Sequence, residues 1–502
     1  MSCLAFQREI AHNGAICLPE TAMKKKLILL LAILSLVLPA CLCSVPVPFT
    51  PTPATPTWTP LPLPPTSADP AAGAAGLGDP YYPLLGNGGY DALHYDLTLD
   101  VDMAGDTVTG ILVLDAQATQ DLSAFNLDLS GLTVSGVWVD SAPAGFSRNG
   151  TELTIIPAAA LTNGSRFTVR VEYAGTPRGV SDPALSLGDG IGWLDLPSGV
   201  YTINEPSGSM GWFPSNNYPT DKARYTFRVT VAEPYMVAAN GLLTQETDNG
   251  DTTTYVWEVS NPMSSYLASV NIARFDKRIS TGPDGLLIRS YFESSVPEAD
   301  IAAFDALPEM IAFYSDIIAP YPFEAYGVVV MPERVGVAME NQTLSVFGAD
   351  MCFEEAIAHE LAHQWFGNSV TVSNWPDIWL NEGFATYLEW LWVEHTQGQA
   401  AFNIYVDGMY QSAQDMPAPG DPPSYGLFDW SVYIRGAWVL HALRLTVGDE
   451  TFFKILQTYY QRYQYSNART EDFIDVAQEV SGRDLSAFFD AWLYAGQIPP
   501  KP

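Results

Sequence analysis

The chain has 502 residues, of which 47% are hydrophobic, and it carries a formal net charge of −33 at pH 7. Chains of this length and apolar content can bury more than one core and usually fold as several domains. So large an excess of acidic residues would repel nucleic acid and anionic lipid surfaces. We therefore expect a multidomain protein that binds no nucleic acid and that would need an attached lipid to associate with a membrane.

Residues 1–40 have the pattern of a secretory signal peptide. Lysines at positions 24–26 precede an apolar run over residues 27–38. The run is too short to span a bilayer comfortably, and a short apolar core after a basic start is typical of a cleaved leader. Met23, directly before the lysines, is a second candidate for the start of translation.

The leader ends in Leu38-Pro39-Ala40-Cys41, which resembles a bacterial lipobox. In a lipobox the cysteine is acylated and becomes the new amino terminus. We therefore predict a lipid anchor at Cys41 and a location on the outer face of a membrane in the cell envelope. Residues 41–79 are rich in Pro, Thr and Ala and nearly free of charge. Such a composition cannot bury a core, so it predicts an extended linker.

Alternation of apolar and polar residues begins at His94 and continues to Asp102, which is the period of a half-buried strand. His94 falls on the polar face of this strand, so we do not expect it to be a metal ligand. The same pattern recurs over residues 107–114, 151–156, 166–173, 225–231 and 254–259, and the last segment follows an Asn249-Gly250 turn of the hairpin type. These strands predict an all-β domain, a β-sandwich or saddle, over residues 80–275.

After Phe275 the pattern changes to that of a mixed domain. Residues 326–331 form a short apolar segment that is typical of a buried strand. Helical spacing of apolar residues predicts helices over 300–318, 354–366, 382–395, 434–446, 451–464 and 484–494. We therefore predict an α+β domain over residues 276–502, with a functional site between its helices.

The helix predicted over 354–366 contains His359-Glu360-Leu361-Ala362-His363. Residues four apart lie on one face of a helix, so His359 and His363 can present two imidazoles to one metal ion, and Glu360 beside them can accept a proton from water. Apolar and small residues flank the motif, which favours a buried helix over a pair of surface histidines. With Glu382 as the third ligand one position stays open, which is typical of a catalytic zinc and not of a structural one.

Glu389 follows Glu382 by seven residues in the same predicted helix, so both side chains lie on the same face. We predict that Glu389 orients one of the ligand histidines from behind. His395 and His441 have no partner at ligand spacing, and we expect them to be structural. Cys352 is more often a small buried hydrophobic residue than a ligand in such a position.

Together these residues resemble the aminopeptidase N family of gluzincin zinc metallopeptidases. The resemblance covers residues 359–371, 375–383 and, in the β domain, 211–223. It implies a thermolysin-like catalytic domain after the β domain, Glu360 as the general base, and one zinc ion per chain held by His359, His363 and Glu382. Many family members have a further helical domain, and this chain ends soon after residue 433, so the resemblance implies a short two-domain form.

Residues 336–341 resemble the exopeptidase loop of the family, except that Val337 stands where the family has glycine. The resemblance implies that Glu340 holds the free amino group of the substrate and that Ala338 and Met339 lie against the substrate.

Two further roles rest on the same resemblance. Glu205, by its spacing to Pro214, falls where the family has a second residue that binds the amino group. Tyr433 matches the tyrosine motif of the family and would donate a hydrogen bond to the oxyanion of the tetrahedral intermediate.

We therefore predict a zinc-dependent aminopeptidase that uses metal-activated water to release residues from peptides with a free amino terminus. Two alternatives stay open. A zinc endopeptidase would lack an acidic anchor for a terminal amine, and Glu340 argues against it. An inactive lipoprotein or binding module usually loses at least one catalytic residue, whereas here the ligands, the base and the tyrosine are all present.

Overall fold

The computed structural model describes residues 70–185, 187–188 and 190–502. The predicted signal peptide, the predicted acylation site at Cys41 and most of the predicted linker lie outside this range. Ala71–Ala72 already form a strand, β1, which pairs with β4 (Leu122–Asp128). The last residues of the predicted 41–79 linker therefore belong to the fold. A two-residue strand pairs through its backbone alone, and it is too short to show the alternation of apolar and polar residues by which a strand is predicted.

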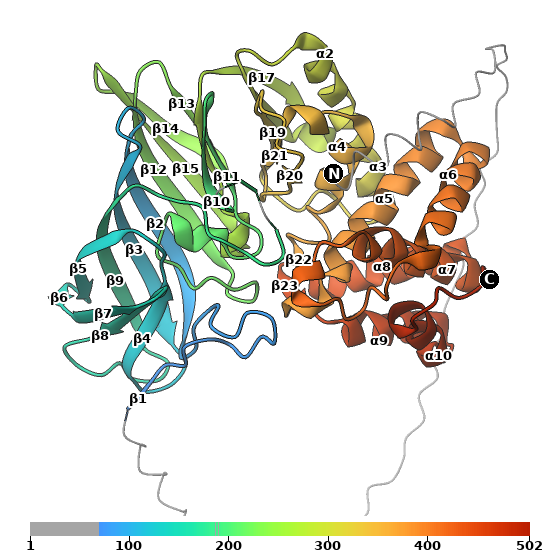
Figure 1. The fold of residues 1–502 in the computed structure, drawn as a ribbon, viewed down its shortest axis with the longest axis horizontal. Coiled ribbons are helices and arrows are strands. Elements are labelled where there is room, and N and C mark those ends of the chain that lie inside the picture. Colours follow the sequence, from blue (N-terminus) through green and yellow to red (C-terminus); the bar gives the residue numbers. More distant parts are fainter. Residues whose placement is uncertain (1–69, 186, 189) are drawn as a thin grey trace, which may run out of the picture. The chain divides into compact units, whose positions relative to one another are not determined.

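The first half of the described chain consists of strands, coloured blue to green in Figure 1, and we call residues 70–274 the β domain. Its largest sheet has eight strands in the order β14-β15-β12-β2-β3-β9-β5-β6. Alternate residues of β2 and β3 are buried, so one face of this sheet packs on the core. The strands are β2 (Tyr90–Asp102), β3 (Thr107–Ala118), β5 (Thr133–Val139), β6 (Ala142–Pro143), β9 (Arg166–Gly175), β12 (Ala223–Ala232), β14 (Leu242–Asp248) and β15 (Thr252–Met263).

Two four-stranded sheets, ordered β1-β4-β8-β7 and β10-β11-β16-β13, complete the β domain. Every residue of β11 and β16 is buried, so these strands are covered on both faces and show no alternation that a sequence could reveal. The remaining strands are β7 (Gly145–Asn149), β8 (Glu152–Ile156), β10 (Gly192–Leu196), β11 (Gly199–Ile203), β13 (Met236–Ala239) and β16 (Val270–Ala273).

A five-stranded mixed sheet, ordered β17-β18-β19-β21-β20, opens the second half of the chain, which we call the α+β domain (residues 275–502). β18, β19 and β21 are parallel neighbours, whereas β17 and β20 pair antiparallel at the two edges. The strands are β17 (Phe275–Thr281), β18 (Leu287–Glu293), β19 (Ala325–Val330), β20 (Ala338–Met339) and β21 (Ser345–Phe347), and a separate parallel pair is formed by β22 (Val370–Val372) and β23 (Ser466–Ala468).

Helices make up most of the remaining chain and are coloured yellow to red in Figure 1. They are α2 (Glu298–Ile301), α3 (Leu307–Ile317), α4 (Glu354–Ala362), α5 (Trp379–Gln397), α6 (Gln399–Ser412), α7 (Gly436–Val447), α8 (Asp449–Tyr463), α9 (Thr470–Ser481) and α10 (Ser486–Phe489). Two π-helical turns are η9 (Ser431–Arg435) and η10 (Asp490–Tyr494). The 3-10 turns are η1 (Gly208–Gly211), η2 (Ser265–Leu267), η3 (Pro283–Gly285), η4 (Ala302–Ala306), η5 (Ala349–Met351), η6 (Trp375–Asp377), η7 (Ala413–Asp415) and η8 (Ser424–Gly426).

The structure confirms a β domain followed by an α+β domain and corrects several predicted helices. The helix predicted over 354–366 ends at Ala362. The one predicted over 300–318 is divided into α2, η4 and α3. Pro308, in the first turn of α3, cannot donate the backbone hydrogen bond that would join α3 to η4. Helices α6 and α9 were not predicted, although the apolar residues that each buries recur at helical spacing: 402, 406 and 409 in α6, and 473, 476 and 477 in α9.

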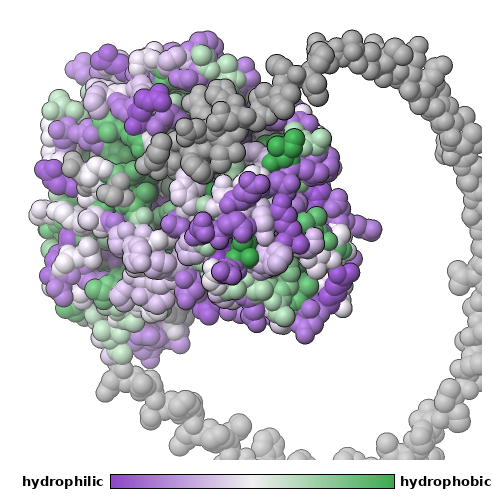
Figure 2. Space-filling view, turned by 45° about the vertical axis from the view of Figure 1, so that its right-hand side comes forward, coloured by the Kyte–Doolittle hydropathy of each residue, from purple (hydrophilic) through white to green (hydrophobic). Residues whose placement is uncertain are grey.

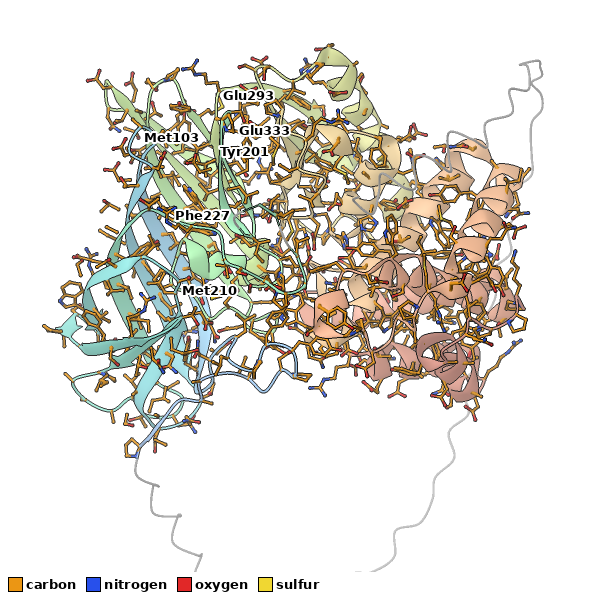
Figure 3. All side chains as sticks on the ribbon, in the orientation of Figure 1. Met103, Tyr201, Met210, Phe227, Glu293 and Glu333 are labelled. Carbon is orange, nitrogen blue, oxygen red and sulfur yellow. The ribbon has the colours of Figure 1, made fainter. Side chains whose placement is uncertain are left out.

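The two domains contact each other through buried and half-buried polar groups. Ser198, in the turn between β10 and β11, donates from its backbone N–H and its hydroxyl to the two carboxylate oxygens of Glu333, over 3.1 and 2.8 Å. The same hydroxyl lies 2.8 Å from the hydroxyl of Tyr201. Glu333 and Tyr201 are labelled in Figure 3, and Glu333 follows β19 of the second domain.

Hydrophilic residues cover much of the face that Figure 2 shows, with hydrophobic residues in smaller groups between them. This agrees with the strongly acidic composition. Within the part of the chain that the structure describes, no helix combines the length and the hydropathy that a bilayer crossing requires.

Candidate active site

Helix α4 supplies the two histidines of the site. Glu354 and Glu355 occupy its first turn, where the helix dipole favours acidic side chains. Ile357 is fully buried, so the helix is embedded and not a solvated face. His359 lies in the last turn, and His363 follows as the C-cap with φ −56° and ψ −24°. The helical geometry therefore continues through both histidines, and their rings lie 4.7 Å apart between centroids.

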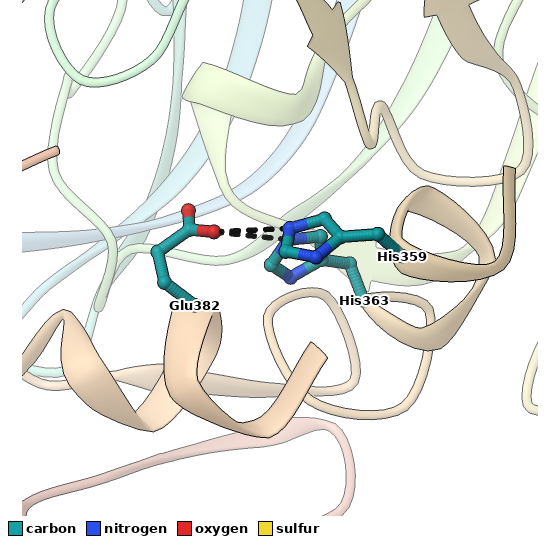
Figure 4. Close-up of side chains that lie close together, drawn as sticks. All are labelled: His359, His363 and Glu382. Carbon is teal, nitrogen blue, oxygen red and sulfur yellow. Dashed lines mark hydrogen bonds and ion pairs between the residues drawn. The ribbon is translucent and has the colours of Figure 1, made fainter. Parts of the chain in front are cut away.

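Helix α5 brings Glu382 opposite these histidines, as Figure 4 shows. Glu382 Oε2 lies 3.2 Å from His359 Nε2 and 3.4 Å from His363 Nε2, and the two Nε2 atoms are 3.1 Å apart. Zinc ligands at about 2.0–2.1 Å on the corners of a tetrahedron are roughly 3.3 Å from one another. The three donor atoms therefore have the spacing of one face of a tetrahedral zinc site, and these residues fit the metal.

The far side of each imidazole faces an acceptor. His363 Nδ1 lies 3.1 Å from the carbonyl oxygen of Phe366, so Nδ1 carries the proton and Nε2 presents its lone pair to the donor cluster. Glu389, fully buried, has an oxygen 3.6 Å from His359 Nδ1, and the Tyr405 hydroxyl donates to its other oxygen over 3.0 Å. Glu389 thus lies behind His359, a predicted zinc ligand.

Neighbouring groups fix the helices and the turn around these side chains. The Tyr314 hydroxyl, from α3, lies 3.2 Å from the carbonyl oxygen of Ala358 in α4 and 3.1 Å from that of Leu388 in α5. After His363 the chain turns at Gly367, whose φ is 138°. A Cβ at Gly367 would lie only 2.9 Å from His363 Nδ1, so a larger residue would displace the imidazole.

Burial and the neighbouring side chains shift the pKa values of two glutamates in the site in opposite directions. Burial would raise the pKa of Glu382, but His363 and His359 outweigh it and lower the pKa to about 2. Burial raises the pKa of Glu360 to about 8, since the two histidines offset only part of it. Burial would lower the pKa of His359, but Glu382, Glu389 and Glu360 raise it to about 10. Glu382 is therefore ionised, whereas the buried Glu360 holds a proton more tightly than an ordinary glutamate does.

Two more carboxylates lie next to this cluster. Glu340, directly after β20, has an oxygen within 4.8 Å of donor atoms of Glu360 and His363. Glu205 follows β11, and burial, together with the neighbouring carboxylates of Glu340, Glu382 and Glu360, raises its pKa well above the ordinary value. Glu340 and Glu205 are only 3% and 5% exposed, and Oε1 of each has no hydrogen-bond partner among the described residues. Buried carboxylates with unused acceptor atoms are costly unless a cation binds them.

Tyr433 lies beside the ligand set, in the π-helical turn η9 just before α7. Its ring stacks on that of His359, with centroids 5.8 Å apart and an interplanar angle of 23°. The close approach of helices α5 and α7 depends on two glycines, because a Cβ at Gly383 would lie 3.0 Å from the backbone of Gly436. Helices α5 and α7 therefore touch backbone to backbone next to Glu382. Such π turns inside helices are frequent at functional sites.

The other predicted residues lie as follows. Ala338 and Met339 form β20, the edge strand that leads into Glu340. His94 contacts the Thr226 hydroxyl at 3.0 Å, and His441 lies 3.3 Å from the Tyr387 hydroxyl. His395 stacks on Phe313, and Cys352 is half-buried. Among the described residues, both groups whose donor atoms could hold a metal ion belong to the site around His363.

Two residues next to the histidine motif were not predicted. Gln364 donates from Nε2 to the carbonyl oxygen of Glu340 and accepts from the backbone N–H of Thr343, both over 2.9 Å. Asn368 donates from Nδ2 to the same Glu340 oxygen over 2.7 Å. Both contacts join segments that are distant in the sequence, so no local pattern could have revealed them.

Two family models match the chain. The model of the peptidase family M1 domain matches residues 302–492, and that of the peptidase M1 N-terminal domain matches residues 91–267. The crystal structure of an M1 zinc metallopeptidase from Deinococcus radiodurans is similar, with 31% identity, a TM-score of 0.80, and coverage of 85% of this chain and 98% of that chain. A mutant form of that enzyme, bound to a Tyr-Ser-Ala substrate, is 32% identical with a TM-score of 0.80, over 85% of this chain and 99% of that chain.

Curated relatives are longer than this chain. Aminopeptidase M1 of Arabidopsis thaliana is 26% identical over 439 residues, which are 79% of this chain and 49% of the relative. Glutamyl aminopeptidase of Mus musculus is 26% identical over 447 residues, which are 80% of this chain and 46% of the relative. The chain thus spans about half the length of these relatives.

Proposed function

The chain belongs to peptidase family M1, which confirms the resemblance found in its sequence, and on this premise we propose that it is a zinc aminopeptidase. It would hydrolyse the first peptide bond of peptides with a free amino terminus. His359, His363 and Glu382 would hold one zinc ion, which is supported by the 3.1 to 3.4 Å spacing of their donor atoms. A zinc ion in such a site polarises a carbonyl group and lowers the pKa of water to about 7.

The proton path would run through Glu360. Its carboxylate accepts a proton from the attacking water and gives it to the leaving nitrogen as the C–N bond breaks. The position of Glu360 supports this role, because a carboxylate oxygen of Glu360 lies within 4.8 Å of a ring nitrogen of His363, a predicted zinc ligand. Tyr433, stacked on His359, would donate its hydroxyl to the oxyanion, and Glu389 would hold His359 in orientation.

One observation carries the assignment as an aminopeptidase: two buried carboxylates, Glu340 and Glu205, have acceptor atoms with no partner in the described protein, directly beside the predicted zinc ligands. A terminal ammonium group is small and cationic and can donate three hydrogen bonds, so it would satisfy both carboxylates at once. β20, formed by Ala338 and Met339, is the edge strand of its sheet, and its outer edge would pair with the backbone of the bound peptide.

The same observation disfavours the alternatives. An endopeptidase has the middle of a chain at this point, which offers no ammonium group to the two buried, unpartnered carboxyl groups. An inactive binding module would have no reason to keep the complete set of Glu360, Tyr433 and the predicted zinc ligands.

The test is to identify the products that the purified full chain releases from a peptide of about ten residues. With one zinc ion bound, mass spectrometry should show single amino acids released in order from the amino terminus. Chelation should abolish the release and added zinc should restore it. Internal fragments would indicate an endopeptidase, and no cleavage at full zinc occupancy would indicate an inactive module.

We also propose that the protein is secreted and held at the cell envelope by a lipid on Cys41. The basic and apolar leader before Cys41 supports this, and the net charge of −33 disfavours binding to an anionic membrane surface through charge alone. Mass spectrometry of the mature amino terminus should find an acylated Cys41. An unmodified terminus at another residue would instead indicate secretion without a lipid anchor.

A further inference from the structure

The turn that follows the second histidine, Gly367–Ser369, accepts hydrogen bonds from the β domain at three successive carbonyls. The Tyr266 hydroxyl, in η2, donates to Gly367 O over 3.1 Å. The Lys222 ammonium, just before β12, donates to Asn368 O and to Ser369 O, each over 3.0 Å. Its third bond, also 3.0 Å, goes to Ser466 O. The turn is therefore tied to the domain that supplies Glu205.

The same turn is tied to Glu340 from its other side. Asn368 Nδ2 donates to Glu340 O over 2.7 Å, and Gln364 Nε2 donates to the same oxygen over 2.9 Å. Gln364 also accepts from the backbone N–H of Thr343, which ends the short loop after Glu340. Asn368, Gln364 and Glu340 are all fully or almost fully buried, so these bonds are shielded from water.

A second cation, from the α+β domain itself, ties the loop to the β domain. The Arg289 guanidinium, in β18, donates to Thr343 O over 2.9 Å and to Ala239 O over 3.0 Å. Gly241 N donates to the Thr343 hydroxyl over 2.8 Å. Lys222 and Arg289 both donate to backbone carbonyls here, so their hydrogen bonds hold main-chain segments in position.

These contacts matter because the two amine-binding carboxylates come from different domains. Glu205 follows β11 of the β domain, whereas Glu340 follows β20 of the α+β domain. Both must lie within about 2.7–3.2 Å of one ammonium nitrogen to bond it, so a relative shift of 1 Å between the domains would break one of the two contacts. The histidines and Glu382 all belong to the α+β domain and do not depend on this distance.

We propose that Lys222 and Asn368 are positioning residues that set the distance between Glu205 and Glu340 and thereby the recognition of the substrate amino terminus. Lys222 fixes the Gly367–Ser369 turn to the β domain. Asn368 in turn fixes Glu340 relative to this turn, through its hydrogen bond to the carbonyl oxygen of Glu340. The inference rests on the proposed aminopeptidase function and adds that the selectivity for a free amine depends on this turn. Neither residue would touch the substrate.

The test compares Lys222→Met and Asn368→Ala with a matched control, Asn467→Ala. Asn467 also joins the two domains, since its Nδ2 donates to Pro219 O and to Val372 O, both over 3.0 Å, but it does not touch the turn. A role in stability alone would make all three variants behave alike. Each is assayed for zinc content, thermal unfolding, and kcat and KM with one peptide that has either a free or an acetylated amino terminus.

We expect Lys222→Met and Asn368→Ala to keep zinc and to lose on the order of tenfold to a hundredfold in kcat/KM for the free-amine peptide, mainly through a higher KM. Their residual rate on the acetylated peptide should match wild type, so the preference for a free amine falls by the same factor. Asn467→Ala should keep the wild-type preference even if its unfolding temperature falls. Should Lys222→Met not fold, Asn368→Ala and the milder Tyr266→Phe serve the same comparison.

The proposal is overturned if wild type prefers the free amine and Asn368→Ala retains that preference, or if Asn467→Ala loses it equally. A wild type without any preference would instead refute the aminopeptidase function itself, so the two failures can be told apart.

Discussion

Glu340→Gln is the substitution that most directly probes amine recognition, because it removes one charge and almost no volume. Glu340 is 3% exposed and its Oε1 has no partner among the described residues, so the carboxylate is desolvated before substrate binds. A charge-assisted hydrogen bond in such a site contributes about 1.5 to 3 kcal/mol, and a neutral amide replaces it poorly. Since 1.36 kcal/mol corresponds to a tenfold change, kcat/KM for a free-amine peptide should fall about 10- to 150-fold.

The assay measures kcat/KM of zinc-loaded wild type, Glu340→Gln and Glu333→Gln with the same aminoacyl-anilide. Glu333 is a fitting control, since it lies in the same segment, accepts two hydrogen bonds from Ser198 and belongs to neither group of residues that could hold a metal ion. Zinc content should be equal in all three proteins, because neither glutamate is a predicted ligand. A Glu340→Gln enzyme within about twofold of wild type would refute the role of Glu340 as an amine anchor.

Three further predictions concern the base, the metal and the fold. Glu360→Gln should keep zinc but lose about 10² to 10⁴ in kcat, whereas His363→Ala should lose the zinc itself. Elemental analysis and kinetics check both variants. A Glu360→Gln enzyme with more than about a tenth of wild-type activity would exclude Glu360 as the base. Glu389→Gln should weaken zinc affinity about 10- to 100-fold in a chelator competition, and unchanged affinity would contradict its contact with His359. Burial and then Arg444 lower the pKa of His441 to about 4, so below pH 6.5 the unfolded chain gains a proton at this residue that the folded chain does not. The contribution of His441 to stability should therefore fall by about 2 kcal/mol between pH 7 and pH 5. In His441→Phe this loss should disappear from urea unfolding curves, and an equal loss in both proteins would contradict the reasoning.

The parts of the site that sequence reasoning located are those with local geometry. His359 and His363 are four residues apart in a helix, and Glu382 and Glu389 are seven apart in another, so each pair shares a face whatever the rest of the fold does. Half-buried strands such as β2 were predicted for the same reason, because their alternation is local.

The parts that sequence reasoning missed depend on tertiary contact. Strand β16 is buried on both faces and has no period to detect. Asn368 and Lys222 are polar residues next to well-defined motifs, and nothing nearby in the chain shows that one bonds Glu340 and the other bonds the turn. The proximity of Glu205 to Glu340 was reached only through the family resemblance, since 135 positions separate them in the sequence.

The most direct test of the aminopeptidase assignment is the rate at which the zinc-loaded wild type cleaves two peptides that differ only in acetylation of the amino terminus. Acetylation removes the positive charge that Glu205 and Glu340 would bind. The loss of two charge-assisted contacts predicts a kcat/KM at least about a hundredfold lower for the acetylated peptide. Equal cleavage of the two peptides would contradict the aminopeptidase assignment while leaving the zinc site intact.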